Sequence, residues 1–155
     1  MTTSLQPVPP TTNTVSVDEM ALTHRIALVM DPSLDRGAAG NRCAVLATGL
    51  VARHPEIIGS DLATSDGLQL FGFTKVPIAV LAGKGQPLRE LASRARESGC
   101  TTLVFLSRAQ GMRSYDAYKQ SIAQTPSSEL DVDAVAVLGP KKTVNSLVGA
   151  LPCLR

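Results

Sequence analysis

A run of four residues, Gly139, Pro140, Lys141 and Lys142, is the part of this sequence best suited to binding an anion. It follows an apolar segment and precedes a helical pattern, so it would place free backbone N–H groups and two cations at the start of a helix. Cations are unfavourable beside the positive end of a helix dipole. The two lysines therefore predict either a bound anion or a turn in which both side chains are solvated.

Four further polar residues follow predicted strands. Asp35, Arg36 and Asn41 come after the first strand, and Arg108 comes after the third. Ligands of open α/β sheets bind beyond the ends of strands. Asn41 would orient a ligand by hydrogen bonds, and Arg108 would add its charge to that of the two lysines. Solvation of Arg108 at the surface is the alternative.

Residues for catalysis or metal binding are scarce. The chain has only two histidines, His24 and His54, and its three cysteines are Cys43, Cys100 and Cys153. No two residues among His, Cys, Asp and Glu have the tight spacing of a metal site, and no base is adjacent in sequence to Cys43. We therefore predict no metal and no cofactor, and we assign no catalytic residue.

The composition narrows the class of protein. The chain has 155 residues, 44% hydrophobic and 18% charged, with a net charge of +2, which suits one compact domain. The sequence shows no basic stripe and only 3% aromatic residues, which argues against nucleic-acid binding by phosphate neutralisation or base stacking. Three widely spaced cysteines indicate no disulfide framework, and no apolar run approaches the roughly 20 residues of a membrane span. We expect a cytoplasmic protein with no membrane partner.

Two parts of the chain differ in pattern. Residues 1–22 are rich in Pro, Thr and Ser and predict a disordered leader, with a targeting role as the alternative. Residues 23–155 predict a single α/β domain. Strands are expected at 25–30, 76–81, 101–106 and 132–138, helices at 41–54, 88–98, 114–124 and from 139 onward, and an Asp-Gly hairpin between 57–63 and 68–73.

Three positions carry specific expectations. Asn41 stands where the first long helix needs an N-cap. Gly49 lies inside the same helix and is expected to mark close packing. Pro140 is expected in the first turn of the last helix. The alternation of strands and helices predicts a three-layer α/β sandwich, with helices on both faces of a small, mostly parallel or mixed sheet and an appended small hairpin.

Several segments carry a resemblance to a known family. They are RIALVMDPSLDRG, GNRCAVLATGL, the T-S-D-G hairpin, KVPIAVL and LDVDAVAVLGPKKTVNSLVGAL. They resemble the family catalogued as domain of unknown function two thousand, over about residues 24 to 152, and the L-G-P-K-K helix start is the most specific of them.

The resemblance carries expectations about fold and activity. That family is similar in fold to type II peptidyl-tRNA hydrolase, which implies a mixed four-stranded sheet with helices on both faces. The hydrolase has a Gly-Lys-rich loop after its first strand, then a Gln and a His. The matching stretch here is 37–44, without lysines, and the Gln and His positions fall at about Ala44 and Ala47. The Asp that follows the hydrolase's third core strand aligns near Arg108. The hydrolase's Gly-Pro before the last helix is kept here as Gly139 and Pro140. The resemblance thus implies the fold without a general base.

Three functional hypotheses result. The leading one is a non-catalytic protein that binds a small anionic or phosphorylated ligand between the loops after the first, third and fourth strands. The second is peptidyl-tRNA hydrolysis by an altered site in which Asp35, Arg36 and Asn41 replace the usual groups, the only case with an RNA partner. The third is an interaction module, either a homodimer or a module that docks a partner, because the related hydrolases resemble dimers.

Overall fold

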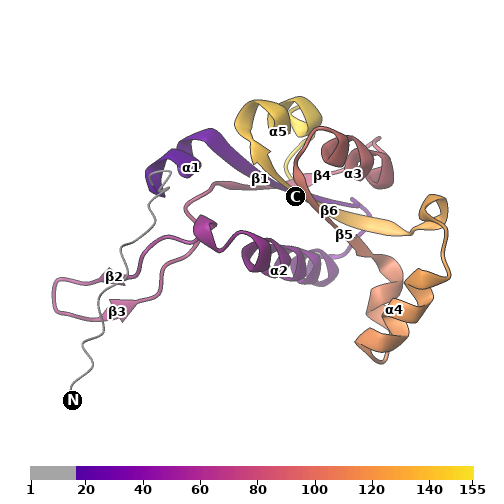
Figure 1. Cartoon of the computed structure of the whole chain (residues 1–155), viewed down its shortest axis with the longest axis horizontal. Helices are drawn as coiled ribbons and strands as arrows, with labels where there is room; N and C mark the ends of the chain where they lie inside the picture. Colours follow the sequence, from indigo (N-terminus) through magenta and orange to yellow (C-terminus); the bar gives the residue numbers. More distant parts are fainter. Residues whose placement is uncertain (1–16) are drawn as a thin grey trace, which may run out of the picture.

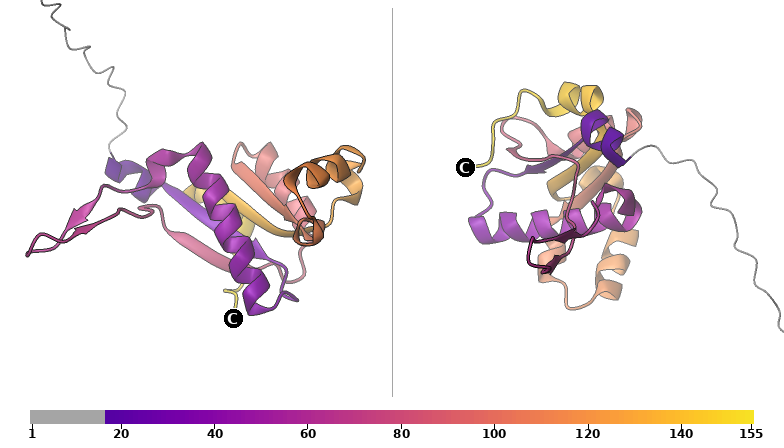
Figure 2. Two further views of the ribbon diagram at one scale, coloured as in Figure 1. Left: turned by 90° about the horizontal axis from the view of Figure 1, so that it is seen from below. Right: turned by 90° about the vertical axis from the view of Figure 1, so that its left-hand side faces the viewer.

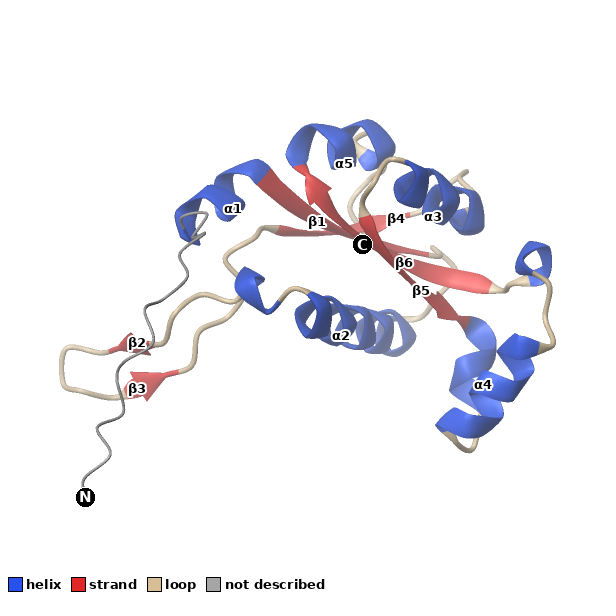
Figure 3. Ribbon diagram, viewed as in Figure 1, coloured by secondary structure: helices blue, strands red, loops and turns tan. Residues whose placement is uncertain are grey.

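The structure of the chain, a computed structural model, describes residues 17–155 (Figure 1). Five α-helices, a four-stranded sheet and a two-stranded hairpin make up the described part (Figure 3). In chain order the elements are α1 (Val17–Thr23), β1 (His24–Met30), α2 (Arg36–Arg53), η1 (Pro55–Ile57), β2 (Leu62–Ala63), β3 (Gln69–Leu70), β4 (Ile78–Ala82), α3 (Leu88–Glu97), β5 (Thr101–Leu106), η2 (Ser107–Gly111), α4 (Tyr115–Ala123), η3 (Ser127–Glu129), β6 (Val132–Pro140) and α5 (Lys141–Val148).

The main sheet is mixed. Its strand order is β4-β1-β6-β5, with β1 parallel to β4 and β6 antiparallel to both β1 and β5. The central strands β1 and β6 are almost wholly apolar and buried, as expected for strands covered on both faces. This sheet confirms the predicted mixed α/β architecture.

Two apolar cores lie on opposite faces of the sheet. Alternate residues of the strands point to opposite faces, so Ile26 and Leu28 join the core under α2, whereas Ala27 and Val29 join the core under α3 and α5. Figure 1 shows α2 on one side of the sheet and α3 and α5 on the other. The helices on both faces confirm the predicted layering.

Helix α2 packs closely on the edge strand β5. A Cβ atom added at Gly49 would lie 2.4 Å from Cδ2 of Leu103, so any larger residue at position 49 requires Leu103 to move. The expectation that Gly49 marks close packing is confirmed.

The start of α2 differs from the prediction. The helix begins at Arg36, and its N-cap is Asp35, whose carboxylate accepts a hydrogen bond of 2.8 Å from the backbone N–H of Ala38. Asn41 therefore lies inside the helix and is not its cap. The glycine-containing stretch before Asn41 suggested a loop, but the aspartate cap stabilises a helix that starts six residues after β1 ends.

The last two elements also meet at a different point. Strand β6 continues through Gly139 and Pro140, which pair with Arg25 and His24 of β1. Pro140 has φ −54° and ψ 136° and stands before α5 as its N-cap, outside the first turn. At the end of a strand, the missing N–H of proline costs the sheet no hydrogen bond. Proline is therefore compatible both with a strand end and with the first turn of a helix.

The predicted leader is helical in its last part. Helix α1 occupies Val17–Thr23, within and just beyond the range 1–22, and it packs against β1 and η1. The rest of the leader prediction, residues 1–16, lies outside the described residues. No helix between residues 17 and 155 is both long and apolar enough to cross a bilayer.

The segment 59–74 forms an arm that extends from the body of the molecule (Figure 2). Its strands β2 and β3 share only two residue pairs, fewer than the alternating pattern predicted, and the bridge between Ile58 and Thr74 closes its base. Gly67 adopts φ 93° in the turn, a conformation that glycine adopts without strain. The predicted hairpin is confirmed with shorter strands.

The chain beyond α5 returns to the outer edge of β4. The backbone N–H of Leu154 donates to the carbonyl of Val80, and the N–H of Ala82 donates to the carbonyl of Pro152. Cys153 forms an isolated antiparallel bridge with Leu81. Residues 152–154 thus occupy hydrogen-bonding positions that an edge strand otherwise presents to solvent.

Candidate functional site

The direction of β6 divides the predicted site residues between two ends of the sheet. Because β6 runs antiparallel to β1, Met30 at the end of β1 pairs with Ala134 near the start of β6, and His24 at the start of β1 pairs with Pro140. The segments after β1 and β5 therefore share one end with the start of β6. The run 139–142 lies at the other end, so the structure does not form the single pocket that the sequence predicted.

At that other end, packing accounts for the glycine. A Cβ atom at Gly139 would lie 2.7 Å from Sγ of Cys100, which is too close for any residue but glycine without a shift. Lys141 and Lys142 are exposed on the first turn of α5. Lys141 lines a small hollow beside α1, whereas Pro140 is exposed at the strand end.

Arg108 is used to hold neighbouring segments together. Its backbone N–H and its Nε donate to the two carboxylate oxygens of Asp131, at 2.7 and 2.5 Å, and its Nη1 donates to the hydroxyls of Ser121 and Thr125, at 3.3 and 2.6 Å. Partial burial acts to raise the pKa of Asp131, but the hydrogen bonds from Arg108 outweigh it and hold that pKa below its ordinary value. Arg108 therefore joins η2 to α4 and to the residue that precedes β6.

Asp35 and Arg36 stand at the start of α2. The Asp35 carboxylate is occupied by capping the helix, and Arg36 is exposed in its first turn. Of the predicted residues, Asn41 alone lines a hollow beside α2.

This hollow, called the α2 hollow below, has a volume of about 530 Å³. It lies between the first half of α2 and the segment that leaves the carboxyl end of β5, a position where α/β sheets bind ligands. Its lining consists of Gly37, Ala38, Asn41, Arg42, Val45, Phe105, Ala109 and Gln110.

One lining residue of the α2 hollow, Arg42, belongs to a buried ion pair. Nη2 of Arg42 donates to the Asp133 carboxylate at 2.8 Å, and the two side chains are 3% and 9% exposed. The same Nη2 donates to Oε1 of Gln110 at 2.9 Å. The guanidinium carbon lies 4.3 Å from the centre of the Phe105 ring, so a cation–π contact also holds the group.

The ion pair is not explained by stability alone. Taking two charges out of water costs about as much as their attraction returns, so apolar residues of similar volume would stabilise the fold at least as well. What the pair provides is a fixed orientation. Because arginine only donates, its bond to Oε1 of Gln110 leaves the amide Nε2 of Gln110 as a donor.

The α2 hollow holds donors but no catalytic group. Its lining residues include no carboxylate, imidazole, thiol or hydroxyl. Cys43 is half-buried in α2 outside the lining, and burial raises the pKa of its thiol, which disfavours a reactive thiolate. Within residues 17–155 no three side chains among His, Cys, Asp and Glu gather closely enough to hold a metal ion.

The sequence contained a signal for this site that was missed. The buried positions of α2 are Ala39, Arg42, Leu46 and Leu50, so an arginine occupies the apolar stripe of the helix. Asp133 likewise stands in an otherwise apolar strand. Two opposite charges, each alone in a buried segment, are the pattern that predicts an internal ion pair.

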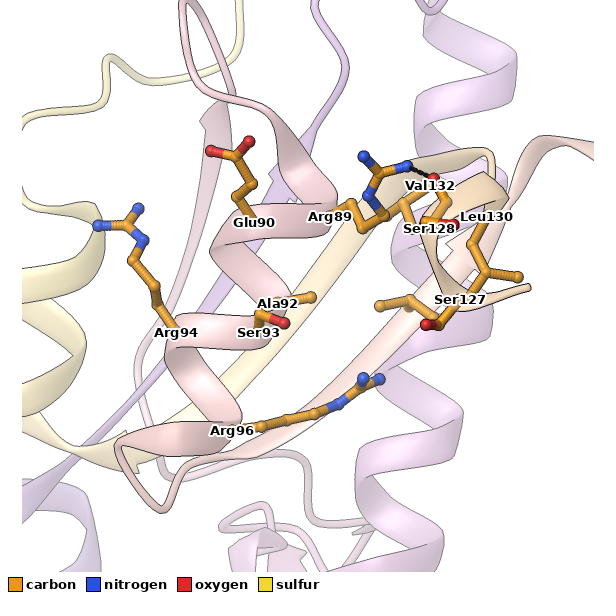
Figure 4. Close-up of a pocket in the computed structure, with 11 residues that line it drawn as sticks. Arg89, Glu90, Ala92, Ser93, Arg94, Arg96, Ser127, Ser128, Leu130 and Val132 are labelled. Atoms are coloured by element: carbon orange, nitrogen blue, oxygen red, sulfur yellow. Dashed lines mark hydrogen bonds between the residues drawn. The ribbon is translucent and has the colours of Figure 1, made fainter.

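A second hollow lies on the opposite face, between α3 and η3 (Figure 4). This α3 groove has a volume of about 490 Å³, with Val104 and Val132 among its lining residues. Its arginines, Arg89, Arg94 and Arg96, are all exposed, and Arg89 donates to the backbone carbonyl of Ser128. Since none of these cations is buried, the groove lacks the fixed polar wall of the α2 hollow.

Comparison with known proteins identifies the family. The model of the DUF2000 family, described as a protein of unknown function, matches residues 24–155. The chain belongs to this family. The solved structure of Atu0240 is similar to this chain. Atu0240 is a protein of unknown function from Agrobacterium tumefaciens strain C58. The two structures have a TM-score of 0.75 at 23% sequence identity, over 84% of this chain and 97% of that one. That likeness shows a shared fold. No curated protein matches the sequence.

Proposed function

We propose that this DUF2000 protein binds a small ligand through an anionic group in the α2 hollow. The observation that carries the proposal is the buried guanidinium of Arg42. Its Nε and Nη2 bond to Asp133 and Gln110, whereas Nη1 makes no hydrogen bond to any residue in 17–155. Arg42 lines the hollow, so Nη1 is the donor that a ligand would meet.

Two amides supplement that donor. Nε2 of Gln110 is free to donate because Oε1 accepts from Arg42. Asn41 is exposed on α2 beside Arg42 and lines the same hollow. Together these three side chains suit a carboxylate or phosphate oxygen, whose bonds to a charged donor are stronger than those between neutral groups.

The remaining lining is apolar. Phe105, Val45 and Ala109 contribute carbon surface to the same hollow, and a volume of about 530 Å³ lies in the range of small-molecule sites. A ligand with an apolar portion beside its anionic group therefore fits better than a bare inorganic anion.

The charge at the site favours a ligand with one anionic group over a polyphosphate. Asp133 offsets the charge of Arg42 at 2.8 Å, and the lysines 141 and 142 lie at the other end of the sheet. With one offset cation, the hollow provides less attraction for a polyphosphate than the single pocket predicted from the sequence. We infer a monocarboxylate or monophosphate class of ligand.

Hydrolysis of peptidyl-tRNA has less support. Asp35 is used as the cap of α2, and no residue lining the α2 hollow is a base that could activate water. The fold likeness to the type II hydrolases and the cytoplasmic location stay predictions.

Thermal shift tests the proposal, because a ligand that binds only the folded state raises its stability. The probes are small monocarboxylates, phosphorylated metabolites and inorganic phosphate, and calorimetry then measures the affinity of the best probe. Asn41→Ala and Gln110→Ala should each weaken it about tenfold. The matched control, Lys141→Ala with Lys142→Ala, should leave it unchanged. Failure of every probe, or a loss confined to the lysine variant, would overturn the proposal.

A further inference from the structure

The arm, residues 59–74, holds more of the exposed large hydrophobic side chains than any other part of the described chain. Phe71 is 90% exposed and Phe73 is 74% exposed. Three leucines of the arm, Leu62, Leu68 and Leu70, are also among the exposed large hydrophobic residues. Five such side chains within twelve positions differ from the scattered apolar residues of an ordinary surface.

The arm has little support from its own protomer. Two pairs of residues join β2 to β3, and an isolated two-stranded hairpin is at best marginally stable in water. Figure 2 shows the arm extending away from the sheet and its helices. We infer that the arm packs against a second copy of this chain.

The area of the arm suits a dimer. A phenylalanine buries about 150–250 Å² when covered, so the two phenylalanines and three leucines together provide roughly 500 Å². In a twofold dimer the arm is used twice, and so is the surface that receives it. The total, about 2,000 Å², lies at the upper end of a standard stable interface.

A receiving surface lies near the base of the arm. Helix α1 packs against η1, where the arm begins, and a hollow of about 270 Å³ lies between α1 and the start of β4. This α1 hollow is lined by Arg25, Ile78 and Lys141 among others. Ile78 of this lining is 40% exposed, and Leu22 of the neighbouring helix α1 is 76% exposed. In a twofold arrangement about this end, each arm reaches the α1 hollow of the other protomer.

Charge supports the same pairing. The only charged residues of the arm are Asp61 and Asp66, whereas the α1 hollow presents Arg25 and Lys141. Opposite charges across an interface fix its register and disfavour other arrangements. Lys141 stands at the start of α5, where the helix dipole favours a nearby negative charge. An aspartate of the second copy would supply that charge.

Light scattering coupled to size-exclusion chromatography tests the inference on the full chain. Wild type should have twice the 16.3 kDa mass of one chain. Phe71→Ser with Phe73→Ser should halve that mass while the circular dichroism spectrum stays unchanged. Tyr115→Ser is the matched control, since Tyr115 is 75% exposed on α4, and it should remain dimeric.

Two more variants identify what the arm contacts. Lys141→Glu should weaken the dimer at least tenfold if the α1 hollow receives the arm, and an unchanged dimer would overturn that assignment. Deletion of residues 2–16 should leave the mass doubled, because the arm contacts the second copy alone. A monomeric wild type, a dimer that survives the double serine change, or a dimer lost with residues 2–16 would each overturn the inference.

Discussion

The two ends of the sheet both carry cations, but they use them differently. At the end where β6 starts, Arg42 and Arg108 each pair with an aspartate of that region, Asp133 and Asp131. At the end where β6 finishes, Lys141 is exposed on the first turn of α5. The difference shows that the role of a cation depends on its partner and its burial. Both are set by the topology, and residue type and spacing alone do not reveal them.

The largest expected effect comes from breaking the buried pair. Arg42→Ala leaves the Asp133 carboxylate buried without its partner, which should lower the free energy of unfolding by about 3–5 kcal/mol. Lys141→Ala, at the other end, should change it by less than about 0.5 kcal/mol. Urea denaturation measures both. Arg42→Met combined with Asp133→Leu should recover most of the loss, and a double variant no more stable than Arg42→Ala would contradict this account.

At the end of the sheet where β6 finishes, the packing of Gly139 should affect stability more than either lysine does. Gly139→Ala places a Cβ 2.7 Å from Sγ of Cys100, and overpacking of this kind costs about 1–3 kcal/mol. Gly40→Ala is the matched control, because nothing lies within 4 Å of its added Cβ. In the interior of α2 that change should stabilise by about 0.5–1 kcal/mol. Thermal denaturation of both variants decides whether packing or an anion explains Gly139.

Arg108→Ala should have a smaller effect that is confined to one region. The side chain is 25% exposed, so solvent replaces part of what its hydrogen bonds to Asp131, Ser121 and Thr125 provide. We expect a loss of about 1–2 kcal/mol and faster amide exchange in α4. Hydrogen exchange followed by mass spectrometry measures the second effect, and uniform acceleration over the whole chain would argue against a local role.

The smallest effect is a dependence on pH. Because the folded-state pKa of Asp131 is lowered, its stabilising contribution is complete above the ordinary aspartate pKa of about 4 and is lost as the pH falls through the folded value. The difference in stability between wild type and Asp131→Asn should therefore be constant from pH 5 to 7 and shrink below about pH 4. Denaturation at several pH values tests this, and a difference that grows on acidification would contradict the sign.

The sequence predicted the fold better than the site. Strand β5 has the expected bounds, Thr101–Leu106, because a short apolar run between a glycine and polar residues leaves few alternatives. The start of α2 was misplaced, since the capping strength of Asp35 is a local property that competes with the glycines after it. The residues predicted to form one pocket could not be placed together without knowing that β6 is antiparallel, and strand direction depends on pairing between distant segments.

Residues 152–154, which hydrogen-bond to the outer edge of β4, also bear on how the protein should be handled. An uncapped strand is a template for strands of other molecules. Removing the final four residues, or fusing a bulky affinity tag directly after Leu151, would bare that template. Preparations altered in this way should be prone to precipitation for a reason unrelated to the ligand site, so a tag is better placed at the opposite terminus.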